Sequence, residues 1–68
     1  MSKKANFCKN LKALRREKNY LQRDVAGKIG VPLSTYANWE QGRTEPGIED
    51  IYKLLEVFEI DANELFDI

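Results

Sequence analysis

The spacing of apolar residues along the chain predicts helices rather than strands. No segment alternates apolar and polar residues over a sustained run, and turn-forming residues recur at intervals that suit short helices. Apolar residues at positions i, i+4 and i+7 first mark an amphipathic helix over residues 5–18, with lysines and arginines on its other side. Asn19 follows as a residue that tolerates the left-handed end of a helix. The stripe of this helix consists of Phe7, Leu11 and Leu14.

Two short helices separated by a turn are predicted next. The first begins near Gln22 and ends at Gly30, because glycine adopts the left-handed conformation without steric penalty. Proline is tolerated at the start of a helix but not inside one, so the second helix opens at Pro32 and runs to Gln41, where Gly42 closes it. This succession has the outline of a helix-turn-helix over residues 22–41. The apolar face of the first of these helices consists of Val25, Ala26 and Ile29.

The rest of the chain predicts one longer helix and one short helix. Residues 43–47 form a loop by composition, and a fourth apolar stripe at helical spacing follows them. Asp61 and Glu64 match a capping box, in which each side chain accepts a hydrogen bond from the other residue's backbone amide, and the box opens the last helix. The predicted fold is therefore all-α, a compact five-helix bundle in a single domain of residues 1–68, with residues 1–4 flexible. The fourth stripe consists of Ile48, Ile51, Leu54, Leu55 and Phe58.

The inventory of reactive side chains argues against an enzyme. The chain has 68 residues, of which 43% are apolar, enough for one small domain without a separate catalytic domain. Cys8 is the single cysteine and histidine is absent, which excludes an internal disulfide, the usual zinc spacings and histidine-based nucleophiles. We therefore predict no metal, no cofactor and no small-molecule ligand. No apolar run suits a transmembrane span or a signal peptide, which predicts a cytoplasmic protein without a membrane partner.

Charge is divided unevenly along the chain. The net charge is zero, which taken alone argues against a nucleic-acid-binding protein. Residues 1–43, however, carry ten Lys and Arg against three Asp and Glu, whereas residues 44–68 carry one Lys against eight Asp and Glu. If these halves lie on different faces, a basic side suits a polyanion and an acidic side is turned away from it. A solvated surface with uneven charge explains the same counts equally well.

The third predicted helix has a face suited to the major groove of DNA. Residues three, four and seven positions apart share a face of a helix, which directs Tyr36, Trp39 and Glu40 to one side and the two rings into the core. The opposite side has no acidic side chain or aromatic ring to keep it out of a groove about 12 Å wide. Asn can pair with adenine, Ser can bond base edges or phosphates, and Ala or Leu can lie against a thymine methyl group. The side chains of this face are Leu33, Ser34, Ala37, Asn38 and Gln41.

These residues resemble the lambda Cro and repressor class of helix-turn-helix DNA-binding proteins. Arg15 and Glu40 stand where the class pairs an arginine of the first helix with a glutamate of the third. The resemblance covers residues 5–66. Within the motif the matching positions are Val25, Ala26, Ile29, Gly30, Val31, Tyr36 and Trp39. From the end of the motif onward they are Glu40-Gln41-Gly42-Arg43, Pro46, the fourth stripe and Asp61-Ala62-Asn63-Glu64-Leu65-Phe66.

The resemblance implies a double-stranded DNA partner and assigns roles to particular residues. The third helix would lie in the major groove with its N-terminal half on the bases. By position, the base-facing residues would be Leu33, Ser34, Ala37 and Asn38. The residues that hold the DNA backbone would be Gln22, Thr35, Gln41 and Arg43. Arg15 and Glu40 would form a structural ion pair.

Three positions depart from the pattern of the class. Leu21 replaces the polar residue that usually caps the second helix, so that cap is predicted to be missing. Pro32 occupies the usual cap of the third helix and has no amide hydrogen to offer a phosphate. Leu33 stands where some members of the class carry a base-reading glutamine. The sequence therefore predicts DNA binding without predicting the operator.

The predicted function is regulation of transcription by a homodimer. Two recognition helices read half-sites about 34 Å apart, so we expect a repressor or autoregulator on a palindromic operator. The candidate dimer interface is the apolar part of the acidic C-terminal end, although Phe66 could instead cover its own core. This interface consists of Ala62, Phe66 and Ile68. The alternative is a protein-interaction module of the same fold, an antitoxin or regulatory subunit that binds a partner through its acidic end.

Overall fold

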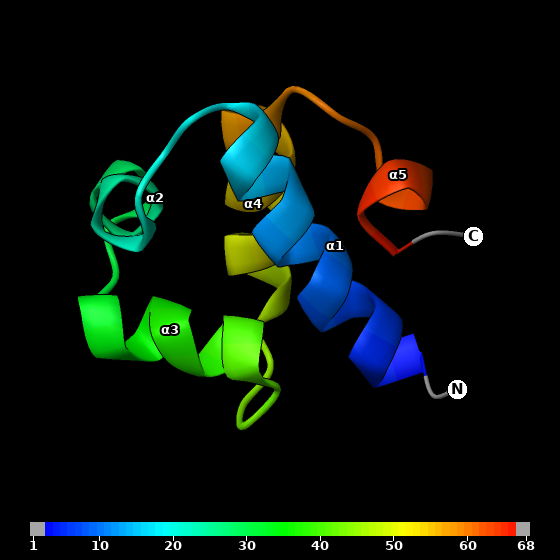
Figure 1. Cartoon of the computed structure of the whole chain (residues 1–68), viewed down its shortest axis with the longest axis horizontal. Helices are drawn as coiled ribbons and strands as arrows, with labels where there is room; N and C mark the ends of the chain where they lie inside the picture. Colours follow the sequence, from blue (N-terminus) through cyan, green and yellow to red (C-terminus); the bar gives the residue numbers. More distant parts are fainter. Residues whose placement is uncertain (1–2, 67–68) are drawn as a thin grey trace.

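Five helices enclose one apolar core (Figure 1). The computed structural model describes the backbone of residues 3–66 and the side chains of residues 7–66. The all-α prediction and the helix-turn-helix outline are confirmed within this part of the chain. No helix in it is long and apolar enough to cross a bilayer. The helices are α1 (Lys3–Glu17), α2 (Gln22–Ile29), α3 (Leu33–Gln41), α4 (Ile48–Phe58) and α5 (Ala62–Phe66).

The start of α1 differs from the prediction. The helix begins at Lys3, two residues before the predicted start, so Lys3 and Lys4 belong to it. Lysine and alanine are good helix formers, and no proline or glycine interrupts the segment before Phe7. The helix therefore extends over the whole basic start of the described chain.

Left-handed residues end the first three helices, as predicted. Asn19 after α1 has a φ of 60°, and Gly30 and Gly42 after α2 and α3 have φ values of 77° and 76°. The amide of Gly30 donates to the carbonyl of Ala26 at 2.9 Å, which closes the last turn of α2. The chain then passes through Pro32 in an extended conformation directly into α3. The turn between α2 and α3 is therefore set by its own residues.

Aspartates stabilise the starts of α2 and α5. Leu21 caps α2 without a side-chain acceptor, as predicted, but Asp24 Oδ2 accepts the Leu21 amide hydrogen at 2.7 Å. The missing cap is therefore partly replaced from inside the helix, by half of a capping box. At α5, Asp61 Oδ1 accepts a hydrogen bond from the Glu64 amide at 2.9 Å, which is one half of the predicted box.

The core is built from the predicted stripes with one exception. Ile48, predicted as a core residue of α4, is 64% exposed. Leu55 lies seven positions on, and therefore on nearly the same side of the helix, and it packs against the core. The exposure of Ile48 thus follows from its place as the first residue of α4. Leu14, Ile51 and Leu55 pack against the core while remaining partly exposed. The buried residues are Phe7, Leu11, Val25, Ala26, Ile29, Tyr36, Trp39, Leu54, Phe58 and Leu65.

The packing of the helices separates α3 from α5. The two helices of the helix-turn-helix pack on each other, α3 also packs on α1, and α2 packs on α4. The short α5 packs on α1. In Figure 1, α3 (green) and α5 (red) lie on opposite sides of the bundle, with α1 and α4 between them. A surface presented by α3 is therefore distinct from one presented by α5.

Candidate nucleic-acid interface

Two aromatic side chains orient α3. Tyr36 is fully buried and Trp39 is almost so, and their rings meet edge to face with centroids 5.9 Å apart. This burial confirms that the rings belong to the core. The opposite side of α3 consequently faces solvent, with Ser34 and Gln41 exposed and Asn38 half-buried. Of the other predicted base-facing residues, Leu33 is exposed and Ala37 is half-buried.

An ion pair ties α3 to α1. Arg15 Nε donates to Glu40 Oε2 at 2.7 Å, and Arg15 Nη2 donates to Glu40 Oε1 at 3.2 Å. Arg15 Nη1 also donates to the backbone carbonyl of Tyr20 at 2.9 Å. The two charged side chains retain only 11% and 3% of their surface. The pair therefore joins α3 to the last turns of α1 and to the segment that leads into α2.

The surroundings of the ion pair keep both side chains ionised. Burial on its own raises the pKa of Glu40, but hydrogen bonds from Arg15 and Gln22, with the charge of Arg15, leave that pKa below its ordinary value. The hydrogen bond to Glu40 raises the pKa of Arg15. Burial also raises the pKa of Tyr36, whose hydroxyl lies near this pair without a hydrogen-bond partner in the described structure. The carboxylate of Glu40 is therefore ionised and compensated at neutral pH.

Gln22 has a contact that the sequence did not predict. Its Nε2 donates to Glu40 Oε1 at 3.1 Å, so the same carboxylate holds residues of α1 and α2. Because an amide nitrogen has two hydrogens, the second remains for an acceptor outside the protein. The bond joins residues 18 positions apart on different helices, and no periodicity in the sequence signals it. Gln22 is therefore oriented before any partner binds.

The other predicted backbone-contacting residues lie along α3 and at its end. Thr35 is half-buried, whereas Gln41 and Arg43 are exposed. The amide of Arg43 donates to the carbonyl of Asn38 at 3.0 Å, which holds the backbone of Arg43 against the last turn of α3. Its side chain thus starts from a fixed position beside the outward face of the helix.

The charged residues of α2 and α3 favour a polyanion. Glu40 is the one acidic residue of α3, and Arg15 neutralises it on the buried side. On α2, Arg23 and Lys28 are exposed, and Asp24 is half-buried with its Oδ2 bonded to a backbone amide. A negatively charged ligand that approaches α2 meets exposed cationic side chains.

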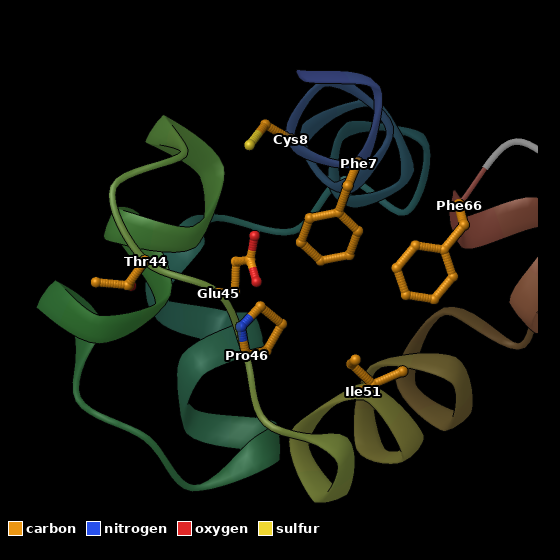
Figure 2. A pocket seen from close by; sticks show the side chains of 7 residues that line it. All are labelled: Phe7, Cys8, Thr44, Glu45, Pro46, Ile51 and Phe66. Atoms are coloured by element: carbon orange, nitrogen blue, oxygen red, sulfur yellow. The ribbon is translucent and has the colours of Figure 1, made fainter. Parts of the chain in front are cut away.

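Of the residues proposed for a dimer interface, Phe66 borders a pocket. Ala62 is exposed, and Phe66 is half-buried with its ring stacked on that of Phe7 at 5.4 Å between centroids. Both rings line a pocket of about 250 Å³, and Figure 2 shows them next to each other. Ile68 lies outside the described residues. The pocket is lined by Phe7, Cys8, Thr44, Glu45, Pro46, Ile51 and Phe66.

Known helix-turn-helix proteins are similar to this chain over its whole helix-turn-helix region. Residues 11–65 match the model of a helix-turn-helix family. The chain is 34% identical over 55 residues to the HTH-type transcriptional regulator AnsR of Bacillus subtilis, covering 81% of this chain and 47% of that protein. It is 34% identical over 59 residues to the cryptic phage CTXphi transcriptional repressor RstR of Vibrio cholerae, covering 87% and 53% respectively. It is 28% identical over 61 residues to the HTH-type transcriptional regulator DdrOP3 of Deinococcus deserti, covering 90% and 47%.

The matches cover most of this chain but only part of each relative. The chain spans about half the length of the curated relatives that it matches. No solved structure matches it significantly. The similarity therefore concerns the helix-turn-helix region of the relatives and not their remaining residues.

Proposed function

The chain belongs to the helix-turn-helix family, and we propose that it is a transcriptional regulator that binds double-stranded DNA in a sequence-specific way. The observation that carries this proposal is the outward side of α3. The core-facing side of α3 is held by buried Tyr36 and Trp39 and by the Arg15–Glu40 pair. The outward side of α3 has no carboxylate. A helix with its side chains is about 10–12 Å across, which fits a major groove about 12 Å wide.

The proposed complex gives each exposed group on α3 a role. Leu33, Ser34, Ala37 and Asn38 face the bases, and the amide of Asn38 can pair with an adenine through one donor and one acceptor. Contacts to phosphates set the position of the protein on the duplex without reading sequence. The residues proposed for them are Gln22, Thr35, Gln41 and Arg43. Gln22 would use the amide hydrogen that Glu40 leaves free.

We further propose that the protein acts as a homodimeric repressor or autoregulator on a palindromic operator. One chain supplies one recognition helix, and tight specific binding by this motif uses two half-sites. Helix α5 lies across the bundle from α3 (Figure 1), so a second copy bound at α5 leaves α3 accessible. Repression would follow from occupancy of the operator. A relative at 34% identity is a phage repressor, which supports this choice.

Selection of bound sequences from random duplex DNA tests the proposal. The expected result is one palindromic consensus that the protein prefers over scrambled duplexes. Asn38→Ala should then weaken binding to the consensus by about 1–3 kcal/mol and relax the preference at one position per half-site, because a base-edge pair is lost. Lys53→Ala, an exposed position of α4, serves as the control with unchanged affinity. Binding without any sequence preference would contradict the proposal.

A second candidate function is a protein-interaction module of the same fold. The acidic excess of residues 44–68 favours it, since this surface suits a basic partner better than DNA. Titration with duplex DNA at several salt concentrations separates the two functions. Affinity that falls steeply with salt supports DNA binding through phosphates, whereas absence of binding at low salt favours the interaction module.

A further inference from the structure

An apolar residue is exposed at the start of the proposed recognition helix. Leu33, the first residue of α3, leaves 49% of its surface accessible although a shared apolar core lies in the same bundle. It is not needed to hold α3, because Tyr36 and Trp39 are the buried residues of that helix. Packing of the core therefore does not explain why an apolar residue stands at position 33.

The neighbours of Leu33 form two parallel rows on the outward side of α3. Leu33 and Ala37, four positions apart, make an apolar row, and Ser34 and Asn38 make a polar row beside it. Pro32, just before the apolar row, has no amide hydrogen and makes no side-chain cap. The side chains at the start of α3 therefore offer an apolar contact at Leu33 and hydrogen bonds from the neighbouring row.

On the basis of the proposed function, we infer that Leu33 reads the 5-methyl group of a pyrimidine base in each half-site. A leucine side chain has neither donor nor acceptor, so placing it over the polar edge of a base would leave that edge without its hydrogen bonds. The methyl group at C5 is the apolar feature that base edges present in the major groove. Thymine carries this group, and 5-methylcytosine carries the same one.

Replacing thymine by uracil tests the inference, because it removes only the methyl group. In the selected operator, each thymine of both half-sites is replaced in turn, and affinity for the 68-residue protein is measured. We expect one position per half-site at which affinity falls about fourfold for each half-site changed, the effect of losing contact with about one methyl group. Leu33→Ala should bind the thymine and uracil operators equally, and Leu33→Met should retain the difference because methionine is also apolar and long.

A second arm distinguishes the two sources of the methyl group. At the sensitive position, cytosine and 5-methylcytosine are compared in otherwise identical duplexes. The parent protein should bind 5-methylcytosine about fourfold more tightly than cytosine for each half-site, and Leu33→Ala should bind both equally. Selection of thymine at this position from unmodified DNA identifies thymine as the natural source. Selection of cytosine, together with the gain from methylation, identifies methylated DNA.

The outcomes separate this inference from the proposed function. If binding is sequence-specific but uracil at every position leaves the affinity unchanged, the inference that a methyl group is recognised is wrong, whereas the proposed DNA-binding function stands. Discrimination that persists in Leu33→Ala assigns the methyl group to another side chain and overturns the role of Leu33. Absence of sequence-specific binding by the parent protein overturns the proposed function itself. Because Leu33 is exposed, helical content and melting temperature should match the parent in both variants.

Discussion

Arg15 of α1 and Glu40 of α3, 25 positions apart in sequence, form a two-point ion pair with Nε 2.7 Å from Oε2. The same carboxylate accepts a hydrogen bond from Gln22 at the start of α2. Three helices therefore meet at one nearly buried group. This carboxylate sets the orientation of α3 relative to the residue proposed to hold a phosphate.

Glu40→Ala should destabilise the fold. Without the carboxylate, the nearly buried Arg15 charge and the Gln22 amide both lose their partner. Breaking a buried pair costs about 3–5 kcal/mol, and we expect a value near the lower end because Arg15 keeps some exposure to water. Urea denaturation followed by circular dichroism measures the loss in the free energy of unfolding.

The exposed pair between Lys18 and Glu59, 3.7 Å apart, provides the matched control for Glu40→Ala. Lys18→Met should change stability by less than about 1 kcal/mol, since exposed ion pairs contribute little. Equal losses in the two variants would show that the Arg15–Glu40 pair behaves as a surface contact.

The contribution of Glu40 to stability should depend on pH. Its pKa in the folded protein is lowered, whereas the unfolded chain has the ordinary glutamate value of about 4.3. The contribution is therefore complete above that ordinary value and is lost as pH falls through the lower, folded pKa. The stability difference between the parent and Glu40→Gln, measured from neutral to strongly acidic pH, should shrink in the acid range. A difference that is constant over the whole range would contradict the lowered pKa.

Arg43→Ala should weaken binding to all duplexes alike. The residue is exposed beside the end of α3, where we propose that it contacts a phosphate. Loss of one phosphate contact reduces the slope of log affinity against log salt by about one for each half-site. Titrations of the operator and of a scrambled duplex at several salt concentrations measure this slope. A loss confined to the operator would show instead that Arg43 reads a base.

Ala62→Arg should produce monomers if α5 forms the dimer interface. Ala62 is exposed and takes no part in the core, unlike Phe66, which stacks on Phe7. A long charged side chain in an apolar interface prevents close packing. Analytical ultracentrifugation and titration of one against two half-sites measure the effect, with Asn63→Arg on the same helix as control. Phe66→Ala together with removal of Ile68 should also give monomers with cooperative binding lost.

Two glycines allow the effects of conformation and of crowding to be separated. Gly30 and Gly42 have nearly the same positive φ, so alanine at either position should cost about 1–2 kcal/mol. An added Cβ meets no neighbour at Gly30 but lies 3.1 Å from Cys8 Sγ at Gly42. Gly42→Ala should therefore be the more destabilising substitution, and Cys8→Ala should remove the excess. Equal melting temperatures for the two glycine variants would show that the Cys8 side chain moves aside freely.

The succession of helices and turns is determined locally, and the sequence alone predicted it. Helices end at Asn19, Gly30 and Gly42 because the backbone of these residues tolerates a positive φ. Helix α3 begins after Pro32 because the fixed negative φ of proline suits the start of a helix. Aromatic residues three apart placed α3 with one side toward the core. These inferences need no knowledge of what lies next to each helix.

Other features were decided by the way the helices meet. Ile48 belongs to an apolar stripe, yet its exposure depends on which turns of α4 the neighbouring helices cover. The bond from Gln22 to Glu40 depends on how closely the start of α2 approaches α3, and that distance is a property of the packed bundle. Sequence spacing describes positions on a single helix, whereas burial and hydrogen bonds between helices require the distances and angles that only the tertiary structure sets.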